Sequence, residues 1–231
     1  MQLLTIDTRT NCYVINPNDM NTLQENVATS LTLENGTFDI QISGGTYSYN
    51  ANETDGEPLV LLWIYGVDGN TFINKNTGIT IGTTWTTLNG YGDRLQLEVP
   101  NKAVLCALFF DIRTDDNSGA IDLLVTSSKA GYSPQTLTVD SQKNCYSLSA
   151  SYLNSLKQWG SNFIEVEPGN YRLKIQSSNA SYWSEDKQFE LEPWALLWMQ
   201  SGKFTPQLTG TEVKETWCSL NGVSDEFVFS V

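Results

Sequence analysis

Apolar and polar residues alternate along several short stretches of the chain, and this is the pattern of half-buried β-strands. Residues 38–42 (FDIQI) and 171–175 (YRLKI) show it, as do residues 94–99 (RLQLEV) and 226–231 (EFVFSV). Residues 59–66 (LVLLWIYG) are apolar at nearly every position, so we expect a central strand that is covered on both faces. The pattern therefore predicts an all-β fold.

Two stretches have helical spacing instead. Residues 16–27 (NPNDMNTLQENV) and 149–160 (SASYLNSLKQWG) begin with residues that favour a helix N-cap and carry apolar side chains three or four positions apart. We expect one short helix in each half of the chain, covering an open end of a β-sandwich.

Much of the sequence is present twice. Residues 4–7 and 11–13 match residues 137–140 and 144–146, and residues 33–42 match 166–175, all at an offset of 133. The phrase EPLVLLW (57–63) returns as EPWALLW (192–198), and residues 83–99 match 215–231. Insertions of one or two residues are what loops tolerate between fixed elements. We infer two tandem, jelly-roll-like β-sandwich repeats, 4–99 and 137–231.

Residues 100–136 have no counterpart in the second repeat. Two apolar stretches, KAVLCALFFDI and AIDLLVTS, flank a polar turn and predict a hairpin over 100–128. The first unit is then 1–131 and the second is 132–231, without a final hairpin of its own. Either the second unit is truncated or the hairpin of the first serves both. The Asn-Gly pairs at 89–90 and 221–222 predict two further hairpin turns of type I′.

Charge and composition narrow the classes of function. Asp and Glu number 26 against 13 Lys and Arg, and a net charge of −13 argues against nucleic acid and anionic membranes as partners. The chain has no histidine, which removes the commonest general base and the usual zinc ligand, so we expect no enzyme. We see no apolar stretch that would span a membrane and no secretory signal. The cytoplasm is the default compartment, with secretion as the alternative if a leader was removed.

The densest polar cluster is a candidate metal site. Residues 111–119 read DIRTDDNSG, in which Asp111, Asp115, Asp116 and Asn117 could supply oxygen ligands to calcium. The alternative is a solvated turn chosen for its Asp, Asn, Ser and Gly residues. The stretch resembles the calcium loop of small bacterial galactose-binding lectins, in which the metal also holds sugar hydroxyls. That resemblance implies a calcium-assisted sugar site.

Four aromatic residues in polar stretches are candidate sugar-binding residues. Tyr47 and Tyr49 lie in GGTYSYNANETDG, and Tyr182 and Trp183 lie in NASYWSEDK. Exposed rings beside Asn and Asp side chains would stack on carbohydrate, whereas the alternative is that they fold back onto their own domain. The tryptophans at repeated positions inside apolar stretches are expected in the core.

A second resemblance covers most of the first unit. The succession NCY, LENGT, GEPLVLLWIYG, LNGYGD, LCALFFD and DDNSG is similar to a small β-rich domain found in cyanobacterial-type proteins. It supports the boundary of the first unit and implies no activity. Cys12–Cys106 and Cys145–Cys218 are conceivable disulfides within each unit, but we expect reduced thiols.

Together these observations favour a non-catalytic, lectin-like carbohydrate-binding module assisted by calcium. The alternative is a protein–protein interaction or assembly subunit that docks a partner through its loops or strand edges.

Overall fold

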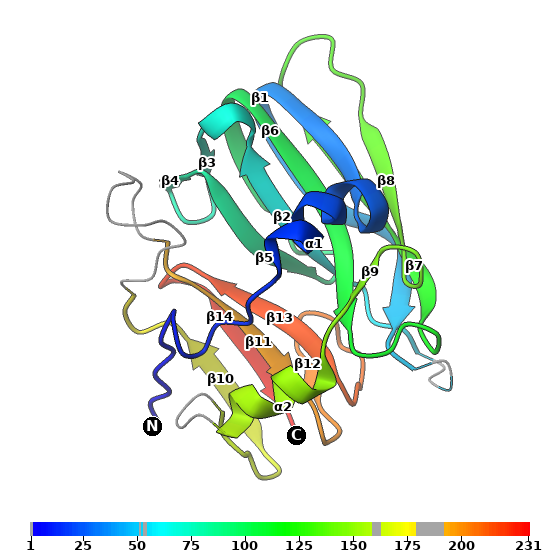
Figure 1. Ribbon diagram of the computed structural model, residues 1–231, viewed down its shortest axis with the longest axis vertical. Coiled ribbons are helices and arrows are strands. Elements are labelled where there is room, and N and C mark those ends of the chain that lie inside the picture. The colour runs from blue at the N-terminus through cyan, green and yellow to red at the C-terminus, as the bar shows by residue number, and fades with distance from the viewer. Residues whose placement is uncertain (1, 51, 53–54, 159–162, 179–191) are drawn as a thin grey trace.

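A computed structural model describes residues 2–50, 52, 55–158, 163–178 and 192–231 of the chain. The protein is mostly β, with 50% of residues in strands and 10% in helices, and this confirms the all-β class. Figure 1 shows a larger group of strands above a smaller one, with helix α2 beside the smaller group. Among the described residues, no helix is long and apolar enough to cross a membrane.

The strands are β1 (Thr29–Ser48), β2 (Leu59–Gly66), β3 (Phe72–Asn74), β4 (Ile79–Ile81), β5 (Thr83–Asn89), β6 (Leu95–Asp111), β7 (Ser118–Ser127), β8 (Gln135–Asp140), β9 (Cys145–Ser147), β10 (Asn170–Lys174), β11 (Trp194–Met199), β12 (Thr205–Pro206), β13 (Thr216–Asn221) and β14 (Glu226–Ser230). The helices are α1 (Pro17–Thr22), which continues as a π-helical turn η1 (Leu23–Val27), a 3-10 turn η2 (Val67–Gly69), and α2 (Ala150–Gln158). The two expected helices are therefore present.

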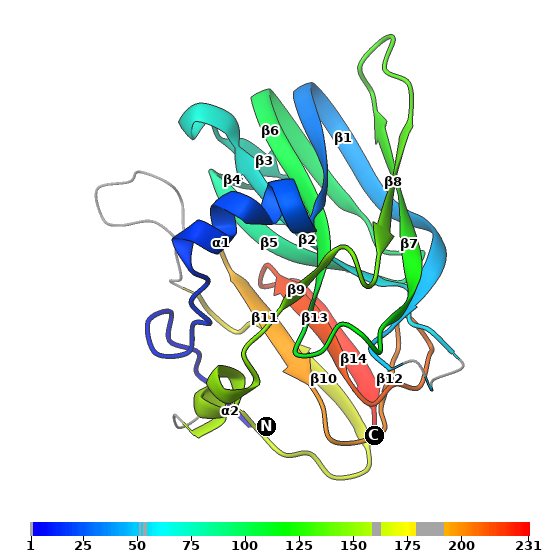
Figure 2. The same ribbon diagram turned by 45° about the vertical axis from the view of Figure 1, so that its right-hand side comes forward.

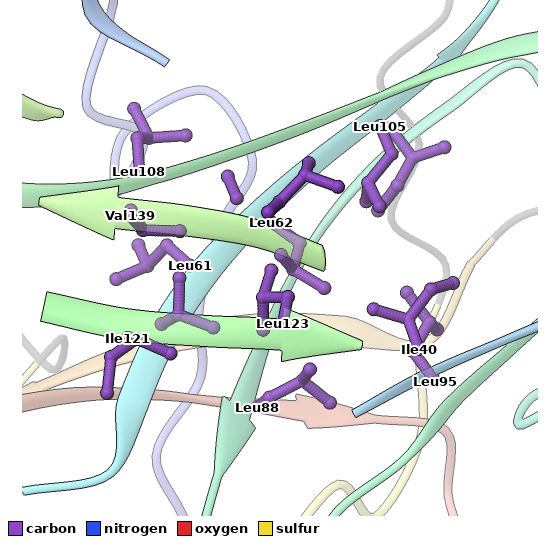
Figure 3. Packing of buried hydrophobic residues seen from close by; sticks show 14 of the residues in the cluster. Ile40, Leu61, Leu62, Leu88, Leu95, Leu105, Leu108, Ile121, Leu123 and Val139 are labelled. Carbon is purple, nitrogen blue, oxygen red and sulfur yellow. The ribbon is translucent and has the colours of Figure 1, made fainter. Parts of the chain in front are cut away.

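Two long strands, β1 and β6, organise the larger group. They pair with each other in an antiparallel register with a bulge between Glu34 and Gly36. On the edge opposite β1, strand β6 pairs first with β3 and further along with β2. The C-terminal part of β1 pairs with β7. Strand β2 has β5 on one edge and β6 on the other, and Leu59–Leu62 are buried, so the predicted central strand is confirmed. Figure 3 shows the leucines, isoleucines and valine that fill the space between these strands.

The smaller group has a separate core. Strands β10, β14 and β12 form one sheet, and β11 pairs with β13 in another. Six buried residues form this core: Phe204, Val213, Cys218, Leu220, Phe227 and Phe229. The two sequence-matched hairpins have the same register, because Trp63 pairs with Trp85 in β2–β5 and Trp198 pairs with Trp217 in β11–β13.

Strands β8 and β9 fall within the second of the two predicted repeats, yet they extend the larger group of strands. Strand β8 pairs with β7 in an antiparallel register, and β9 pairs in parallel with the end of β6. The segment 135–147 therefore belongs to the larger group of strands, as Figure 2 shows from a second side.

The predicted hairpin over 100–128 and both predicted Asn-Gly hairpins are wrong. Strands β6 and β7 do not form a hairpin, because β1 lies between them in the sheet. Asn89-Gly90 does form a turn, but β5 pairs with β2 while β6 pairs with β1, β2 and β3. Asn221-Gly222 likewise joins strands that do not pair, because β13 pairs with β11 while β14 pairs with β10 and β12. The Gly90 N–H donates to the carbonyl of Pro58 (2.7 Å) and continues the ladder between β5 and β2 by one position, and Gly222 repeats this contact with Pro193 (2.6 Å).

Candidate functional site

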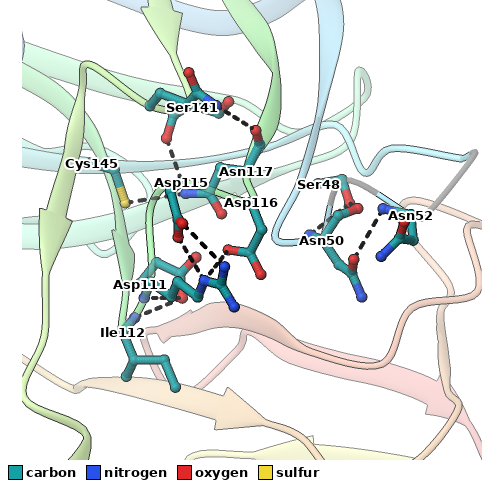
Figure 4. A network of polar contacts seen from close by, with 12 residues as sticks. Ser48, Asn50, Asn52, Asp111, Ile112, Asp115, Asp116, Asn117, Ser141 and Cys145 are labelled. Carbon is teal, nitrogen blue, oxygen red and sulfur yellow. Dashed lines mark hydrogen bonds and ion pairs between the residues drawn. The ribbon is translucent and has the colours of Figure 1, made fainter.

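The predicted calcium loop connects the end of β6 to the start of β7 (Figure 4). Asp111, the last residue of β6, is only 5% exposed. Its Oδ1 accepts the backbone N–H groups of Ile112 (2.6 Å) and Arg113 (3.2 Å), which fixes the first turn of the loop. Its Oδ2 is buried and has no hydrogen-bond partner. Oδ1 of this carboxylate thus stabilises the loop conformation, whereas Oδ2 accepts no hydrogen bond.

Burial raises the pKa of Asp111 to about 6. The negative charges of Glu215 and Asp116 make a smaller contribution to this rise, and the hydrogen bonds from the two backbone N–H groups oppose it. A carboxylate in such surroundings gains most when a positive charge is supplied to it.

Arg113 supplies positive charge to part of the loop. Its Nε lies 2.6 Å from Oδ1 of Asp115, its Nη2 lies 3.1 Å from Oδ2, and both side chains are well exposed. The hydrogen bond from Arg113 lowers the pKa of Asp115. Both Asp115 oxygens are therefore already engaged. Asp116 lies further away, with its Oδ1 3.9 Å from Arg113 Nε, and this buried oxygen accepts no hydrogen bond.

Asn117 fastens the loop to the connection between β8 and β9. It is 2% exposed, and its Nδ2 donates to the carbonyl of Ser141 (3.1 Å) and to Cys145 Sγ (3.7 Å). Its Oδ1 is buried without a partner. The loop therefore holds three buried oxygens that accept no hydrogen bond, Asp111 Oδ2, Asp116 Oδ1 and Asn117 Oδ1, of which Asp116 Oδ1 also forms a long ion pair with Arg113. Both oxygens of Asp115 are engaged by Arg113.

The acidic side chains alone do not make a metal site. Within the described ranges, no group of three or more His, Cys, Asp or Glu side chains is placed to hold a metal ion. The loop offers two carboxylates and one amide oxygen, so a calcium ion here would need water or a ligand to complete its six to eight oxygens.

The expectation that Tyr47 and Tyr49 are exposed is wrong. They are 1% and 9% exposed, because Tyr47 lies within β1, Tyr49 directly follows the strand, and both rings pack in the hydrophobic core. The ring of Tyr47 stacks on Phe109 with centroids 3.8 Å apart, and Tyr49 meets Tyr47 edge-on at 4.4 Å. Burial raises the pKa of both phenols. Neither ring faces solvent, so neither can stack on a sugar.

Tyr182 and Trp183 lie outside the described residues. The four cysteines carry free thiols: Cys12 is exposed, whereas Cys106, Cys145 and Cys218 are buried.

Sequence reasoning missed a polar cavity of about 230 Å³ between the two groups of strands. Its lining includes the matched pairs Asn89/Asn221 and Asp93/Asp225. Each Asp accepts the backbone N–H of its Asn, at 2.9 Å and 2.8 Å, so these carboxylates hold the two turns. The signal that could have located this cavity is the repeated Asn-Gly turn followed by Asp.

Comparisons with protein-family models, with curated proteins and with solved structures found no match.

Proposed function

We propose that the chain is a non-catalytic binding module that takes Ca²⁺ at the β6–β7 loop and binds carbohydrate hydroxyls through that ion. The observation that carries this proposal is the set of three buried oxygens on Asp111, Asp116 and Asn117 that accept no hydrogen bond. Buried polar atoms without partners are rare in folded proteins and call for an explanation such as an ion.

The donor chemistry favours calcium over other metals. All three atoms are hard oxygen donors, and the chain has no histidine. Calcium tolerates an irregular shell of six to eight oxygens, whereas magnesium demands a near-octahedral one. Because the loop fills only part of that shell, the remaining positions are open to water or to vicinal hydroxyl groups of a sugar.

The arrangement of Arg113 is compatible with an ion. Its guanidinium is committed to Asp115 and stays 3.9 Å from Asp116. It donates no hydrogen bond to Asp111 Oδ2, which remains without a partner. A bound cation would therefore supply the positive charge that this carboxylate lacks.

The second part of the proposal is that the chain consists of two tandem β-sandwich repeats. The identical registers of β2–β5 and β11–β13 support it. So do two matched contacts between the repeats: Glu57 accepts from Thr216 (2.6 Å), and Glu192 accepts from Thr84 (2.7 Å). Glu57 and Glu192 are sequence equivalents, as are Thr84 and Thr216.

Calorimetric titration with CaCl₂ tests the ion. Wild type is expected to bind one Ca²⁺, and Asp116→Asn is expected to bind it at least about tenfold more weakly because one charged ligand is lost. Asp68→Asn is the matched control, since Asp68 is an exposed acid in η2, away from the loop. Equal heats from wild type and Asp116→Asn would contradict the proposed site.

The carbohydrate is tested separately on a glycan array, with the labelled chain in CaCl₂ and in EDTA. The expected result is binding to at least one glycan class that disappears in EDTA and in Asp116→Asn. Calcium binding without any glycan signal would leave a metal site and remove the lectin function.

A further inference from the structure

Residues 4–14 and 137–147 fold into the same turn. In both segments an Asp, Asp7 or Asp140, accepts on Oδ1 the backbone N–H groups two and three residues further on, at 2.8–3.0 Å. The Asn four residues after each Asp accepts the N–H of that Asp, at 2.8 Å in the first segment and 2.9 Å in the second. The first segment therefore has the local conformation of the second without its surroundings.

The second segment is docked onto two strands. Val139 in β8 lies opposite Ile121 in β7, and both residues are fully buried. At the other end of the segment, Phe109 N–H donates to Asn144 O (2.8 Å), and Leu148 N–H donates to Asp111 O (2.6 Å). The turn places both arms of the segment so that one extends β7 while the other extends β6.

The first segment leaves the equivalent side chains uncovered. Ile6 is 45% exposed, whereas its counterpart Val139 is 0% exposed. Cys12 is exposed, whereas its counterpart Cys145 is 9% exposed. The exposed apolar atoms are the ones that dock in the second copy.

The backbone of the first segment is also satisfied on one edge only. The hydroxyl of Tyr152 in α2 donates to Cys12 O (3.2 Å) and accepts from Val14 N–H (3.4 Å). Figure 2 shows α2 beside the N-terminal segment. The other edge carries Asn11 O and Ile15 N–H, the equivalents of the two groups that bond β6, and within the described part of the chain neither has a hydrogen bond.

We propose that residues 4–14 are a preformed docking element for a second protein that presents a β-sheet edge like that of β7 and β6. Residues 4–7 add to the partner's edge strand in an antiparallel register, and residues 12–14 pair in parallel with the end of the neighbouring strand. The partner's edge carries apolar side chains at the positions of Ile121 and Leu123, because these are the residues that cover Val139 and Leu137. Strand addition of this kind gains affinity from main-chain hydrogen bonds and specificity from alternate side chains.

A fusion protein supplies such an edge in a defined way. Residues 1–134 are placed directly before Gln2 of the full chain, so that Gln2 follows the added unit as Gln135 follows it in the native chain. The readout is the rate at which a thiol reagent modifies Cys12 in the original unit, with the added unit's own Cys12 replaced by Ser. Docking is expected to slow this reaction roughly tenfold or more, since modification then requires local opening.

Two substitutions in the original unit distinguish docking from general crowding. Ile6→Asp places a charge where Val139 is buried and is expected to restore the rapid reaction of Cys12. Thr5→Asn is the matched control, because its counterpart Thr138 is exposed in the docked strand and donates to Asp122 Oδ1, which an amide can also do, and protection should persist. Slow modification of Cys106 and Cys218 reports that every fusion is folded, since both thiols are buried.

Unchanged reactivity of Cys12 in a folded fusion, or protection that survives Ile6→Asp, would overturn the proposal. Should the fusion not fold, a synthetic peptide of residues 116–128 is titrated into the wild-type chain and amide exchange is followed at residues 4–7. Protection that is lost in Ile6→Asp and kept in Thr5→Asn supports docking, and its absence contradicts it. A wild-type chain that already protects residues 4–14 by forming dimers would replace the separate partner with a second copy.

Discussion

Thr87 and Ser219 bond each other reciprocally across the boundary between the two groups of strands. The backbone N–H of Thr87 donates to Ser219 Oγ (3.0 Å), and the N–H of Ser219 donates to Thr87 Oγ1 (2.9 Å). The two residues are sequence equivalents, and both are buried, at 3% and 6% exposed. Strands β5 and β13 run side by side here (Figure 1), so each group of strands completes hydrogen bonds of the other.

Thr87→Val is expected to destabilise the protein by about 1–3 kcal/mol, because it leaves the buried N–H of Ser219 without its acceptor. It also removes the acceptor of Asn89 Nδ2 (2.7 Å). The measurement is urea unfolding. Thr80→Val, an exposed threonine in β4, is the matched control and should stay within about 0.5 kcal/mol of wild type. Equal stabilities of the two variants would mean that the reciprocal pair does not contribute to stability.

Glu192 makes the stability of the interface depend on pH. Burial raises its pKa from 4.5 to about 7, and the hydrogen bonds from Thr84 and Asn74 oppose the shift. An acid whose folded-state pKa is raised contributes most below its unfolded value, and stability falls as pH rises from about 4.5 to about 7. Thr84→Val should therefore cost more at pH 8, where the carboxylate is charged, than at pH 5. Urea unfolding at both pH values measures this, and a cost independent of pH would contradict it.

Ionisation of Asp111 should also lower the stability of the protein as pH rises, when calcium is absent. Since its pKa is raised from 3.8 to about 6, the free energy of unfolding decreases as pH rises through that window. Asp111→Asn keeps an oxygen for the N–H groups of Ile112 and Arg113 but cannot ionise. Its stability relative to wild type should rise between about pH 4 and pH 6 in EDTA. A difference that stays flat over that window in urea unfolding would show that burial does not shift this carboxylate.

Gly119 is required where β1 passes β7. Its φ is +91°, and a Cβ there would lie 2.1 Å from the carbonyl oxygen of Thr46. Gly69 has a φ of +76° with no atom near an added Cβ, so Gly69→Ala measures the backbone cost alone, roughly 1–2 kcal/mol. Gly119→Ala should cost at least twice as much in thermal or urea unfolding. Equal losses would mean that the close approach to Thr46 relaxes freely.

Local pattern was sufficient to identify the strands and insufficient to pair them. The stretch 59–66 is apolar on both faces, and β2 is central as expected. The insertion of β1 between β6 and β7 depends on a register that joins residues far apart in sequence, such as Tyr47 and Gly119. No periodicity within 100–128 contains that information.

Local sequence pattern likewise predicted only the part of the candidate site that depends on neighbouring residues. Asp, Asn and Gly in 111–119 mark a loop with oxygen donors, and three of those oxygens are buried without a hydrogen bond. The polar neighbours of Tyr47 suggested an exposed loop, but its ring is buried by Phe109, which lies in another strand. The partner of Asp115 was also absent from the sequence argument, although Arg113 stands only two residues away.

The most direct test of the proposed function is the melting temperature of the wild-type chain in calcium and in EDTA. A ligand that binds only the folded state stabilises it by about 2.7 kcal/mol at a hundredfold excess over its Kd. For a chain of 231 residues this corresponds to a rise of roughly 5–10 °C. The proposal predicts that rise in calcium and its loss in Asp116→Asn. The same melting temperature in calcium and in EDTA would contradict a calcium-assisted binding module.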